Sequence, residues 1–391
     1  MLFSYQWLNE YVKIPVSPEK LGERLTLLGF ELESIEKRGE ELSNVITVQI
    51  KTVEPHPNAD RLRIMQAWDG EKEHQVVTAA KNVQQDDIVP LALPGATLAN
   101  DIKIKVSALR GVESFGMFCS EVELGLSDEA PGVWVLPKDT PLGVDFIDYA
   151  QLKDSIIDLD ILPNRGDCQS MIGLAREIAT AYKLPLTLPK TLDASTITGD
   201  TNIKVSVENT EDCPLYTVRG IRCKDALPAT PIWMRQRLQS IGMNSKDLAV
   251  DISNYVLAEY GQPLHTFDWD KIQSDTVQAC RAKNNTSIQS LDDESRDLSA
   301  DEIIIADGSG QPLAIAGVMG GANTAVTESS QTILLEAAIF DPVSIRRAGK
   351  RLGIRSDSVI RFEKGVDPNG VIAASERAAY LFQDLAGAQV E

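Results

Sequence analysis

The sequence changes its pattern twice, and this change constrains the fold more than any other feature. Between about residues 45 and 137, short β-rich runs follow one another, with Gly, Pro and Asn between them at close intervals and no long helix. Closely spaced short strands of this kind are typical of a small β-barrel. Helical patterns precede the block and return between Ser155 and about Leu188. The order of these patterns predicts a barrel inserted into a discontinuous helical domain.

The helical segments on both sides of the block have their own signals. Apolar residues fall at helical spacing in 7–11 and again in 21–28, where Ser17 and Pro18 provide a start signal. After the block, Asp167 is the expected N-cap of a further helix. The apolar face of that helix consists of Met171, Ile172, Leu174, Ala175, Ile178 and Ala179.

The second half of the chain alternates between predicted strands and helices. A polar stretch at 190–202 is typical of a linker, and beyond it β-rich runs alternate with helical patterns. One predicted helix, at 343–353, is opened by Asp341 and Pro342. The alternation predicts an α/β domain over 200–391, and hence a multidomain chain of mixed α+β and α/β class. Because the chain ends directly after its last predicted helix, we expect it to be part of a longer protein.

The composition limits the class of protein. A chain of 391 residues, 43% hydrophobic and 24% charged, is typical of a soluble globular protein. The sequence contains neither an apolar run of about 18 residues nor a signal-peptide pattern, so we expect a cytoplasmic protein without a membrane partner. The five cysteines are odd in number and form no CxxC pair, which argues against a disulfide scaffold or a zinc ribbon.

The net charge limits the kind of nucleic-acid binding that is open to this chain. Its formal charge of −19 disfavours non-specific binding, because affinity for a polyanion comes largely from Lys and Arg that displace counterions. A nucleic-acid partner would therefore have to be held locally and by shape.

The predicted barrel nevertheless carries residues suited to nucleic acid. His56 lies between two prolines and is expected in an exposed turn, with an ordinary turn residue as the alternative. Ser114 belongs to a loop of small residues that would let a backbone approach closely. The cations Lys103, Lys105 and Arg110 can contact phosphates, although the residues alone favour a solvated β-face.

In the α/β region, His265 and Glu336 raise the question of a pocket. His265, within GQPLHTFDWD, is a satisfied core side chain, a metal ligand or part of a pocket. Since the sequence shows no HExxH, metal cluster or Ser-His-Asp pattern, we expect no metal there. Glu336 interrupts the apolar run ILLEAAIF and needs a hydrogen-bonding partner or a ligand, unless it lies on an edge strand or caps one. Gly317 begins a glycine-rich stretch, GVMGG, whose backbone N–H groups can face a ligand, although it is not a P-loop.

Several of these stretches, taken together, resemble the β subunit of bacterial phenylalanyl-tRNA synthetases. The resemblance runs in order over essentially the whole chain and is carried by SYQWLNEYV, EPHPNADRLRI, LRGVESFGMFCSEVELGLS, LPNRGDCQSMIGLAREIA, DISNYVLAEYGQPLHTFDWDKI, IAGVMGG and RFEKGVDP. Chains of this family are about twice as long, so the resemblance implies that this chain corresponds to their N-terminal half.

The resemblance implies a domain organisation. Residues 1–40 and 150–190 would form a discontinuous N-terminal α+β domain, 41–149 an OB-fold tRNA-binding domain, and 200–391 an α/β editing domain. An editing domain of this family hydrolyses tyrosine that has been attached by mistake to the phenylalanine tRNA. A second site is needed because a hydrophobic pocket built for phenylalanine cannot strongly reject a side chain that merely adds a hydroxyl group.

The resemblance also assigns roles to particular residues. His265, Asn254 and Ser253 match positions that line the editing site, with His265 orienting a water rather than acting alone as general base. Gly317 matches its backbone wall, and Glu336 matches the carboxylate that recognises the tyrosine hydroxyl. The remaining implied residues are Ser356 and Ser358 beside the pocket and, for tRNA binding, His56, Lys103, Lys105, Arg110 and Ser114.

The implied partners are the α subunit, in a heterotetramer of two α and two β subunits, and the phenylalanine tRNA. Aminoacylation, with ATP and magnesium, would take place in the α subunit, and this chain by itself would need no cofactor or metal.

Some positions depart from the family pattern. Ser253 stands where Thr is common, Ser358 begins a Ser-Val-Ile run in place of Ala and bulkier residues, and Lys81 alters one barrel loop. These departures leave an alternative open, in which the chain is a tRNA-binding or structural module with a degenerate editing pocket.

Overall fold

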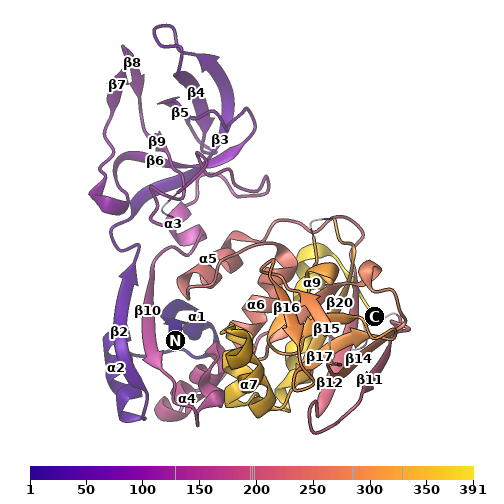
Figure 1. Cartoon of the computed structure of the whole chain (residues 1–391). Coiled ribbons are helices and arrows are strands. Elements are labelled where there is room, and N and C mark those ends of the chain that lie inside the picture. The colour runs from indigo at the N-terminus through magenta and orange to yellow at the C-terminus, as the bar shows by residue number, and fades with distance from the viewer. Residues whose placement is uncertain (128, 194, 196, 198, 284–285, 328) are drawn as a thin grey trace. The chain divides into compact units, whose positions relative to one another are not determined.

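The computed structural model describes residues 1–391 except 128, 194, 196, 198, 284–285 and 328. The chain divides into two compact units: Glu36–Ser155 is one, and Met1–Ile35 with Ile156–Glu391 is the other. We call them the inserted unit and the main unit. Figure 1 shows the elements of both.

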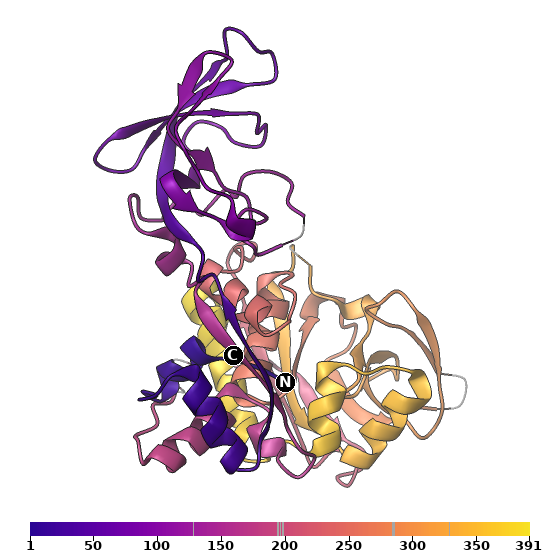
Figure 2. The same ribbon diagram turned by 90° about the vertical axis from the view of Figure 1, so that its left-hand side faces the viewer.

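A curled five-stranded antiparallel sheet forms the inserted unit (Figures 1 and 2). Its strand order is β5-β4-β3-β6-β9, and the strands are β3 (Ser43–Pro55), β4 (Arg63–Trp68), β5 (Glu73–Thr78), β6 (Ile88–Thr97) and β9 (Met117–Phe118). Register shifts at the start of β3, between Ser43 and Val45, and in its middle, between Ile50 and Thr52, let this long strand bend. The core of the unit lies on one face of the sheet and includes Val48, Ile50, Met65, Val89, Leu91 and Phe118.

Shorter elements complete the inserted unit. The hairpin β7 (Ser107–Leu109) and β8 (Val112–Ser114) precedes β9, and the helices are η1 (Ala99–Asp101) and α3 (Phe146–Tyr149). The predicted strand at 132–137 is wrong, because only Leu136 pairs there, through an isolated bridge to Ile88. The backbone of this segment is held instead by the side chain of Asn82, whose amide contacts the N–H and C=O groups of Val133.

The N-terminal part of the main unit contains a three-stranded sheet and three helices. The sheet has the order β1-β10-β2, with β1 (Leu2–Ser4), β10 (Asp154–Asp160) and β2 (Glu31–Arg38). The predicted helices are present as α1 (Tyr5–Tyr11), α2 (Pro18–Leu27) and α4 (Met171–Tyr182), the last preceded by η2 (Gly166–Cys168). The N-cap of α4 is Ser170 and not Asp167, because the Asp167 carboxylate accepts hydrogen bonds from Arg165 instead.

Two further sheets form the rest of the main unit. The first is antiparallel, with the order β13-β20-β12-β21, and consists of β12 (Leu215–Arg222), β13 (Leu264–Asp268), β20 (Thr332–Ile339) and β21 (Gln389–Val390). The second has the order β11-β14-β17-β18-β19 and consists of β11 (Lys204–Val207), β14 (Thr276–Arg281), β17 (Ile303–Asp307), β18 (Pro312–Ile315) and β19 (Met319–Gly320). Here β11 and β14 pair in parallel, and the other pairs are antiparallel. Antiparallel pairing dominates, so the fold as a whole is of mixed α+β class.

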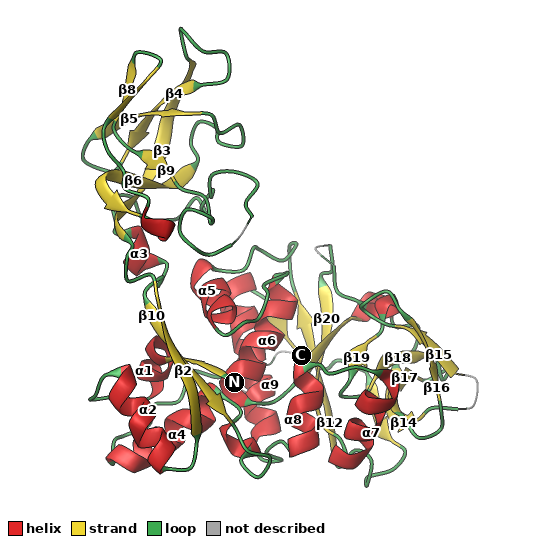
Figure 3. Cartoon of the chain, turned by 60° about the vertical axis from the view of Figure 1, so that its left-hand side comes forward, coloured by secondary structure: helices red, strands yellow, loops and turns green. Residues whose placement is uncertain are grey.

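Helices pack against the first of these sheets and share a hydrophobic core with the second (Figure 3). Helix α6 (Leu248–Tyr260) contacts β13, and α9 (Gly370–Ala386) contacts β20 and β12. The others are α5 (Ile232–Ser240), α7 (Pro342–Leu352) and α8 (Asp357–Lys364), with short turns at η4 (Trp269–Lys271) and η5 (Ala322–Thr324) and a hairpin of β15 (Thr286–Gln289) and β16 (Ser295–Leu298). Three residues of the predicted linker at 190–202 lie outside the described residues.

The helix signals at α7 are confirmed. Asp341 is the N-cap, and its side chain accepts a hydrogen bond from the N–H group of Ser344 at 2.7 Å, while Pro342 occupies the first turn. The helix ends at Gly353, which has a left-handed φ of 69°. In the described part of the chain, no helix is both long enough and apolar enough to cross a membrane.

Candidate pocket in the main unit

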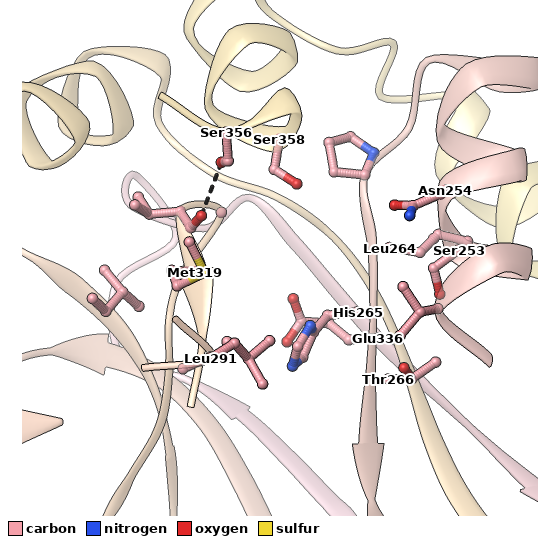
Figure 4. A pocket seen from close by; sticks show the side chains of 18 of the residues that line it. Ser253, Asn254, Leu264, His265, Thr266, Leu291, Met319, Glu336, Ser356 and Ser358 are labelled. Carbon is pink, nitrogen blue, oxygen red and sulfur yellow. Dashed lines mark hydrogen bonds between the residues drawn. The ribbon is translucent and has the colours of Figure 1, made fainter. Parts of the chain in front are cut away.

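A cavity of about 270 Å³ lies in the main unit between the antiparallel sheet, helix α6, the turn from β18 to β19 and the start of α8 (Figure 4). The structure brings together all seven residues that the sequence analysis placed in an editing pocket, because each of them lines this cavity: Ser253, Asn254, His265, Gly317, Glu336, Ser356 and Ser358. Apolar side chains complete the wall, among them Leu264, Leu291, Met319 and Phe362.

His265 and Glu336 form the floor of the cavity. They are directly opposite each other on the paired strands β13 and β20, so their side chains lie on the same face of the sheet. The imidazole packs edge-on against Phe267, with 4.5 Å between the ring centroids. Gly320 leaves room for it, since a Cβ atom at that glycine would lie 2.4 Å from Cε1 of His265.

A hydrogen bond fixes one oxygen of the Glu336 carboxylate. Its Oε2 accepts a hydrogen bond of 2.8 Å from the hydroxyl group of Tyr216 on β12. Its Oε1 has no hydrogen-bond partner among the described residues and is available to a ligand in the cavity. Burial raises the pKa of Glu336 to about 7, although the hydrogen bond from Tyr216 acts in the opposite direction.

The pKa of His265 changes in the opposite direction. Burial lowers the pKa of His265 to about 4, so the imidazole is neutral at physiological pH. Its ring nitrogens have no hydrogen-bond partner in the described part of the chain. A neutral imidazole can donate one hydrogen bond and accept another, which suits it to hold a water or a ligand hydroxyl.

Helix α6 supplies the polar side of the cavity. It ends at Gly261 in a left-handed conformation, with a φ of 78°, and the chain then turns into β13, so that Asn254 and His265 line the same cavity (Figure 4). The hydroxyl group of Ser253 donates to the carbonyl of Ala249 within the helix. The Asn254 amide has no side-chain hydrogen bond among the described residues and is available to a ligand.

The opposite wall is built by backbone and small side chains. Gly317 has a left-handed φ of 65°, and a Cβ atom there would lie 2.9 Å from the Phe362 ring, so this position requires glycine. The hydroxyl group of Ser356 donates to the carbonyl of Val318 at 2.9 Å and caps α8, which fixes the rim of the cavity. The Ser358 hydroxyl has no partner in the described part of the chain.

The sequence analysis missed Tyr216, which positions Glu336. A buried tyrosine needs a partner for its hydroxyl group, and Tyr216 lies in a run that is predicted as a strand. The sequence does not identify that partner, however, because the contact joins residues 120 positions apart.

Of the residues predicted to bind tRNA, the structure leaves three cations exposed, namely Lys103, Lys105 and Arg110. The prediction that His56 is exposed is wrong. Its side chain is buried, with Nε2 3.0 Å from the carbonyl of Leu109 and Nδ1 accepting from the N–H group of Asn58. The imidazole joins two turns because each provides it with a hydrogen-bonding group. Ser114 is also buried, accepting from Val77 and donating to Gly116.

One cluster of possible metal ligands occurs among the described residues, formed by Asp167, Cys168 and Glu177. The guanidinium group of Arg165 contacts both carboxylates, at 3.0 Å from Asp167 and 2.9 Å from Glu177. A cation is therefore already present in this cluster, and we interpret it as an ion-pair network.

Comparisons with known proteins match both units. A family model described as "Putative tRNA binding domain" matches residues 45–145, and one described as "B3/4 domain" matches residues 212–387. The phenylalanine–tRNA ligase beta subunit of Syntrophus aciditrophicus is 41% identical over 392 residues, covering 100% of this chain and 48% of that protein. The protein of the same name from Geobacter sulfurreducens is 42% identical over 393 residues, covering 100% and 49%.

Among solved structures, an N-terminal fragment of the phenylalanyl-tRNA synthetase beta subunit from Pyrococcus horikoshii is 15% identical, with a TM-score of 0.35, and the match covers 61% of this chain and 63% of that one.

These curated relatives define a class, the subunits of tRNA ligases. Within that class, the chain belongs to the family of phenylalanine–tRNA ligase beta subunits. It spans about half the length of the curated relatives that it matches.

Proposed function

We propose that this chain is the tRNA-binding and editing part of a phenylalanine–tRNA ligase, and that the cavity in its main unit hydrolyses tyrosine esterified to the phenylalanine tRNA. The observation that carries the proposal is the arrangement of Glu336. One of its oxygens is anchored by Tyr216, and the other is free at the floor of a largely apolar cavity.

This arrangement favours tyrosine over phenylalanine. The free Oε1 of Glu336 accepts a hydrogen bond from a phenolic hydroxyl group, and a hydrogen bond to a charged acceptor contributes about 1.5–3 kcal/mol. A phenylalanine ring in the same place would leave the carboxylate buried without that partner. A polar group that loses its partner in this way discriminates more strongly than a change in pocket size does.

Hydrolysis of the ester needs a water held beside the carbonyl carbon. The neutral imidazole of His265 and the free amide of Asn254 are the groups that can orient it. The water adds to the carbonyl carbon, the bond to the ribose oxygen breaks, and the proton of the water passes to that oxygen, which gives free tyrosine and free tRNA. Because the ester is an activated one, correct placement of the water supplies much of the rate.

The remaining parts of the proposal follow from family membership. The inserted unit, with a barrel of OB type over about residues 41–149, would bind tRNA through its exposed cations. The main unit would comprise the discontinuous N-terminal domain and the editing domain. Aminoacylation, with ATP and magnesium, would take place in a partner α subunit, in the cytoplasm and in a complex of two α and two β subunits.

A second function is supported by one observation. The Ser358 hydroxyl adds a polar group to the cavity wall, where the resemblance to the family implies Ala, and this favours a tRNA-binding or structural module with a degenerate pocket. In that case the cavity would bind neither amino acid selectively.

The test is the hydrolysis of tyrosyl-tRNA by this chain and by the double variant Glu336→Ala with His265→Ala. We expect the unchanged chain to hydrolyse tyrosyl-tRNA and to spare phenylalanyl-tRNA, and the double variant to lose at least a factor of about 100 in kcat/KM, from about 3 kcal/mol of lost interactions. The matched control is Glu23→Ala with Lys20→Ala, which removes two exposed charged side chains of helix α2. Equal hydrolysis by the double variant and the control would contradict the proposal and support the degenerate pocket.

A further inference from the structure

Helix α7 presents an exposed basic face in an acidic chain. Between Val343 and Arg355 the sequence contains five cations and no acidic residue, whereas the whole chain has a formal charge of −19. All five are exposed: Arg346, Arg347, Lys350, Arg351 and Arg355. We call these five residues the α7 basic face.

Most of these cations have no ionic partner among the described residues. Arg351 pairs with the buried Glu302, at 2.5 Å, and the nearby Asp341 is occupied as the N-cap. The side chains of the other four cations form no ion pair or hydrogen bond within the described ranges. Lys350 and Arg351 lie in the last turn of α7, where cations stabilise the C-terminus of a helix, and this explains why those two positions are basic. The same effect does not account for Arg346 and Arg347, which lie earlier in the helix, or for Arg355 beyond it.

The other face of α7 packs behind one wall of the pocket. Ile345, Ala348 and Gly349 are buried, and a Cβ atom at Gly317 would lie 3.1 Å from Ile345. The chain then passes from α7 into α8, which lies next to it (Figure 3), and Ser356 at the end of that passage and Ser358 in the first turn of α8 line the cavity. Arg355 directly precedes Ser356 at the rim. The basic face therefore lies on the exposed side of a helix whose buried side supports one wall of the pocket.

We infer that the α7 basic face binds the phosphate backbone of the nucleic acid whose end carries the ester into the pocket. This inference rests on the proposed function and extends it, because it says how the polynucleotide, rather than the amino acid, is held. Arginine suits this task since its planar guanidinium group can contact two phosphate oxygens at once. A local row of cations also explains how a strongly acidic chain can bind a polyanion without binding nucleic acid everywhere on its surface.

The test compares two esters of tyrosine as substrates of this chain. One is tyrosyl-tRNA, and the other is the tyrosine ester of adenosine, which contains the terminal nucleoside but no phosphate backbone. The variant is Arg346→Gln, Arg347→Gln and Lys350→Gln together. The matched control, Lys13→Gln, Lys20→Gln and Lys224→Gln, removes three exposed cations elsewhere in the main unit.

We expect the α7 variant to raise KM for tyrosyl-tRNA at least tenfold and to hydrolyse the adenosine ester at the unchanged rate. The dependence of log KM on log salt concentration should become shallower by about 2 to 3, since each lost phosphate contact removes roughly 0.7–0.9 from that slope. The control should resemble the unchanged chain in all three measurements.

Two results would overturn the inference. The first is a tyrosyl-tRNA KM and salt slope in the α7 variant equal to those of the control, which would make an acidic protein partner the occupant of this face. The second is an unchanged chain that uses the adenosine ester as efficiently as tyrosyl-tRNA, because then no contact beyond the terminal nucleoside contributes. Failure to hydrolyse either ester is a different outcome, since it would contradict the proposed function itself and the inference with it.

Discussion

At the scale of single residues, burial moves the pKa values of the two groups on the pocket floor in opposite directions. The pKa of Glu336 rises to about 7 and that of His265 falls to about 4. Near neutral pH the carboxyl group is therefore the one that changes its charge, while the imidazole stays neutral. Any change in ligand selection around neutrality should report on Glu336.

The raised pKa of Glu336 makes a prediction about stability. The pKa of Glu336 is higher in the folded chain than in the unfolded one. The contribution of this group to the free energy of unfolding is therefore fully present below its ordinary pKa of 4.5 and is lost as the pH rises through about 7. Glu336→Gln removes this loss and should raise the free energy of unfolding by up to about 3 kcal/mol at about pH 8, with little gain at about pH 4. Urea unfolding at the two pH values measures the difference.

The control for this prediction is Glu23→Gln, which neutralises an exposed carboxylate. It should shift the free energy of unfolding by less than about 0.5 kcal/mol at either pH. A gain in Glu336→Gln that is the same at both pH values would show that the carboxyl group does not titrate in this range.

At the scale of elements, the pocket depends on how closely β19 approaches β13. Gly320→Ala would place a Cβ atom 2.4 Å from the His265 ring and so displace the imidazole. We expect hydrolysis of tyrosyl-tRNA to fall at least tenfold, at a cost in stability of about 1–3 kcal/mol for the added methyl group. Steady-state kinetics and thermal unfolding measure the two effects.

Gly370→Ala is the matched control, because the added Cβ meets no atom closer than 3.6 Å and the residue lies at the start of α9. This variant should keep the rate of hydrolysis and gain slightly in helix stability. An active Gly320→Ala variant would mean that the position of His265 is not important for hydrolysis.

Elements with local signals could be predicted from the sequence, and those that depend on distant contacts could not. Asp341, Pro342 and Gly353 mark α7 within its own dozen residues, so its bounds were predicted closely. The burial of His56 depends on Leu109, and the hydrogen bond between Tyr216 and Glu336 depends on the register of β12 against β20. At α4, the two possible N-cap residues, Asp167 and Ser170, lie three residues apart. Ser170 is the N-cap because the Asp167 carboxylate accepts a hydrogen bond from Arg165 instead.

The site residues illustrate the same limit. Nothing in the local sequence joins Asn254, Gly317 and Ser356, and they were placed together through the resemblance to a family. The structure brings them to one cavity, while their roles in hydrolysis remain predictions.

At the scale of the whole molecule, the two units have separate cores, so a change in one should leave the other intact. Asp69 in the inserted unit tests this. Burial acts to raise the pKa of Asp69, but hydrogen bonds from His74 and from the N–H groups of Lys72 and Glu71 outweigh it and lower this pKa to about 2. Because the pKa of Asp69 is lowered in the folded chain, its contribution to the free energy of unfolding is present above its ordinary pKa of 3.8. This contribution is lost as the pH falls through about 2.

We therefore expect Asp69→Asn to destabilise the inserted unit by about 1–2 kcal/mol at neutral pH, and by less as the pH falls below about 3. Hydrogen exchange followed by mass spectrometry resolves the two units in the intact chain. Faster exchange should be confined to Glu36–Ser155, and the exposed Asp60→Asn should change neither unit. Faster exchange in the strands β13 and β20 as well would show that the two units share their stability.

The measurement that tests the central claim most directly is the calorimetric titration of this chain with tyrosine and with phenylalanine, at about pH 6 and about pH 8, alongside Glu336→Gln. We predict that tyrosine binds more tightly than phenylalanine, and that this preference increases as the pH rises through about 7, because the carboxylate of Glu336 is the stronger acceptor. The preference should be weaker in Glu336→Gln and should no longer vary with pH. Equal binding of the two amino acids, or a preference that is unchanged in Glu336→Gln, would contradict the claim that Glu336 in this pocket recognises the tyrosine hydroxyl group.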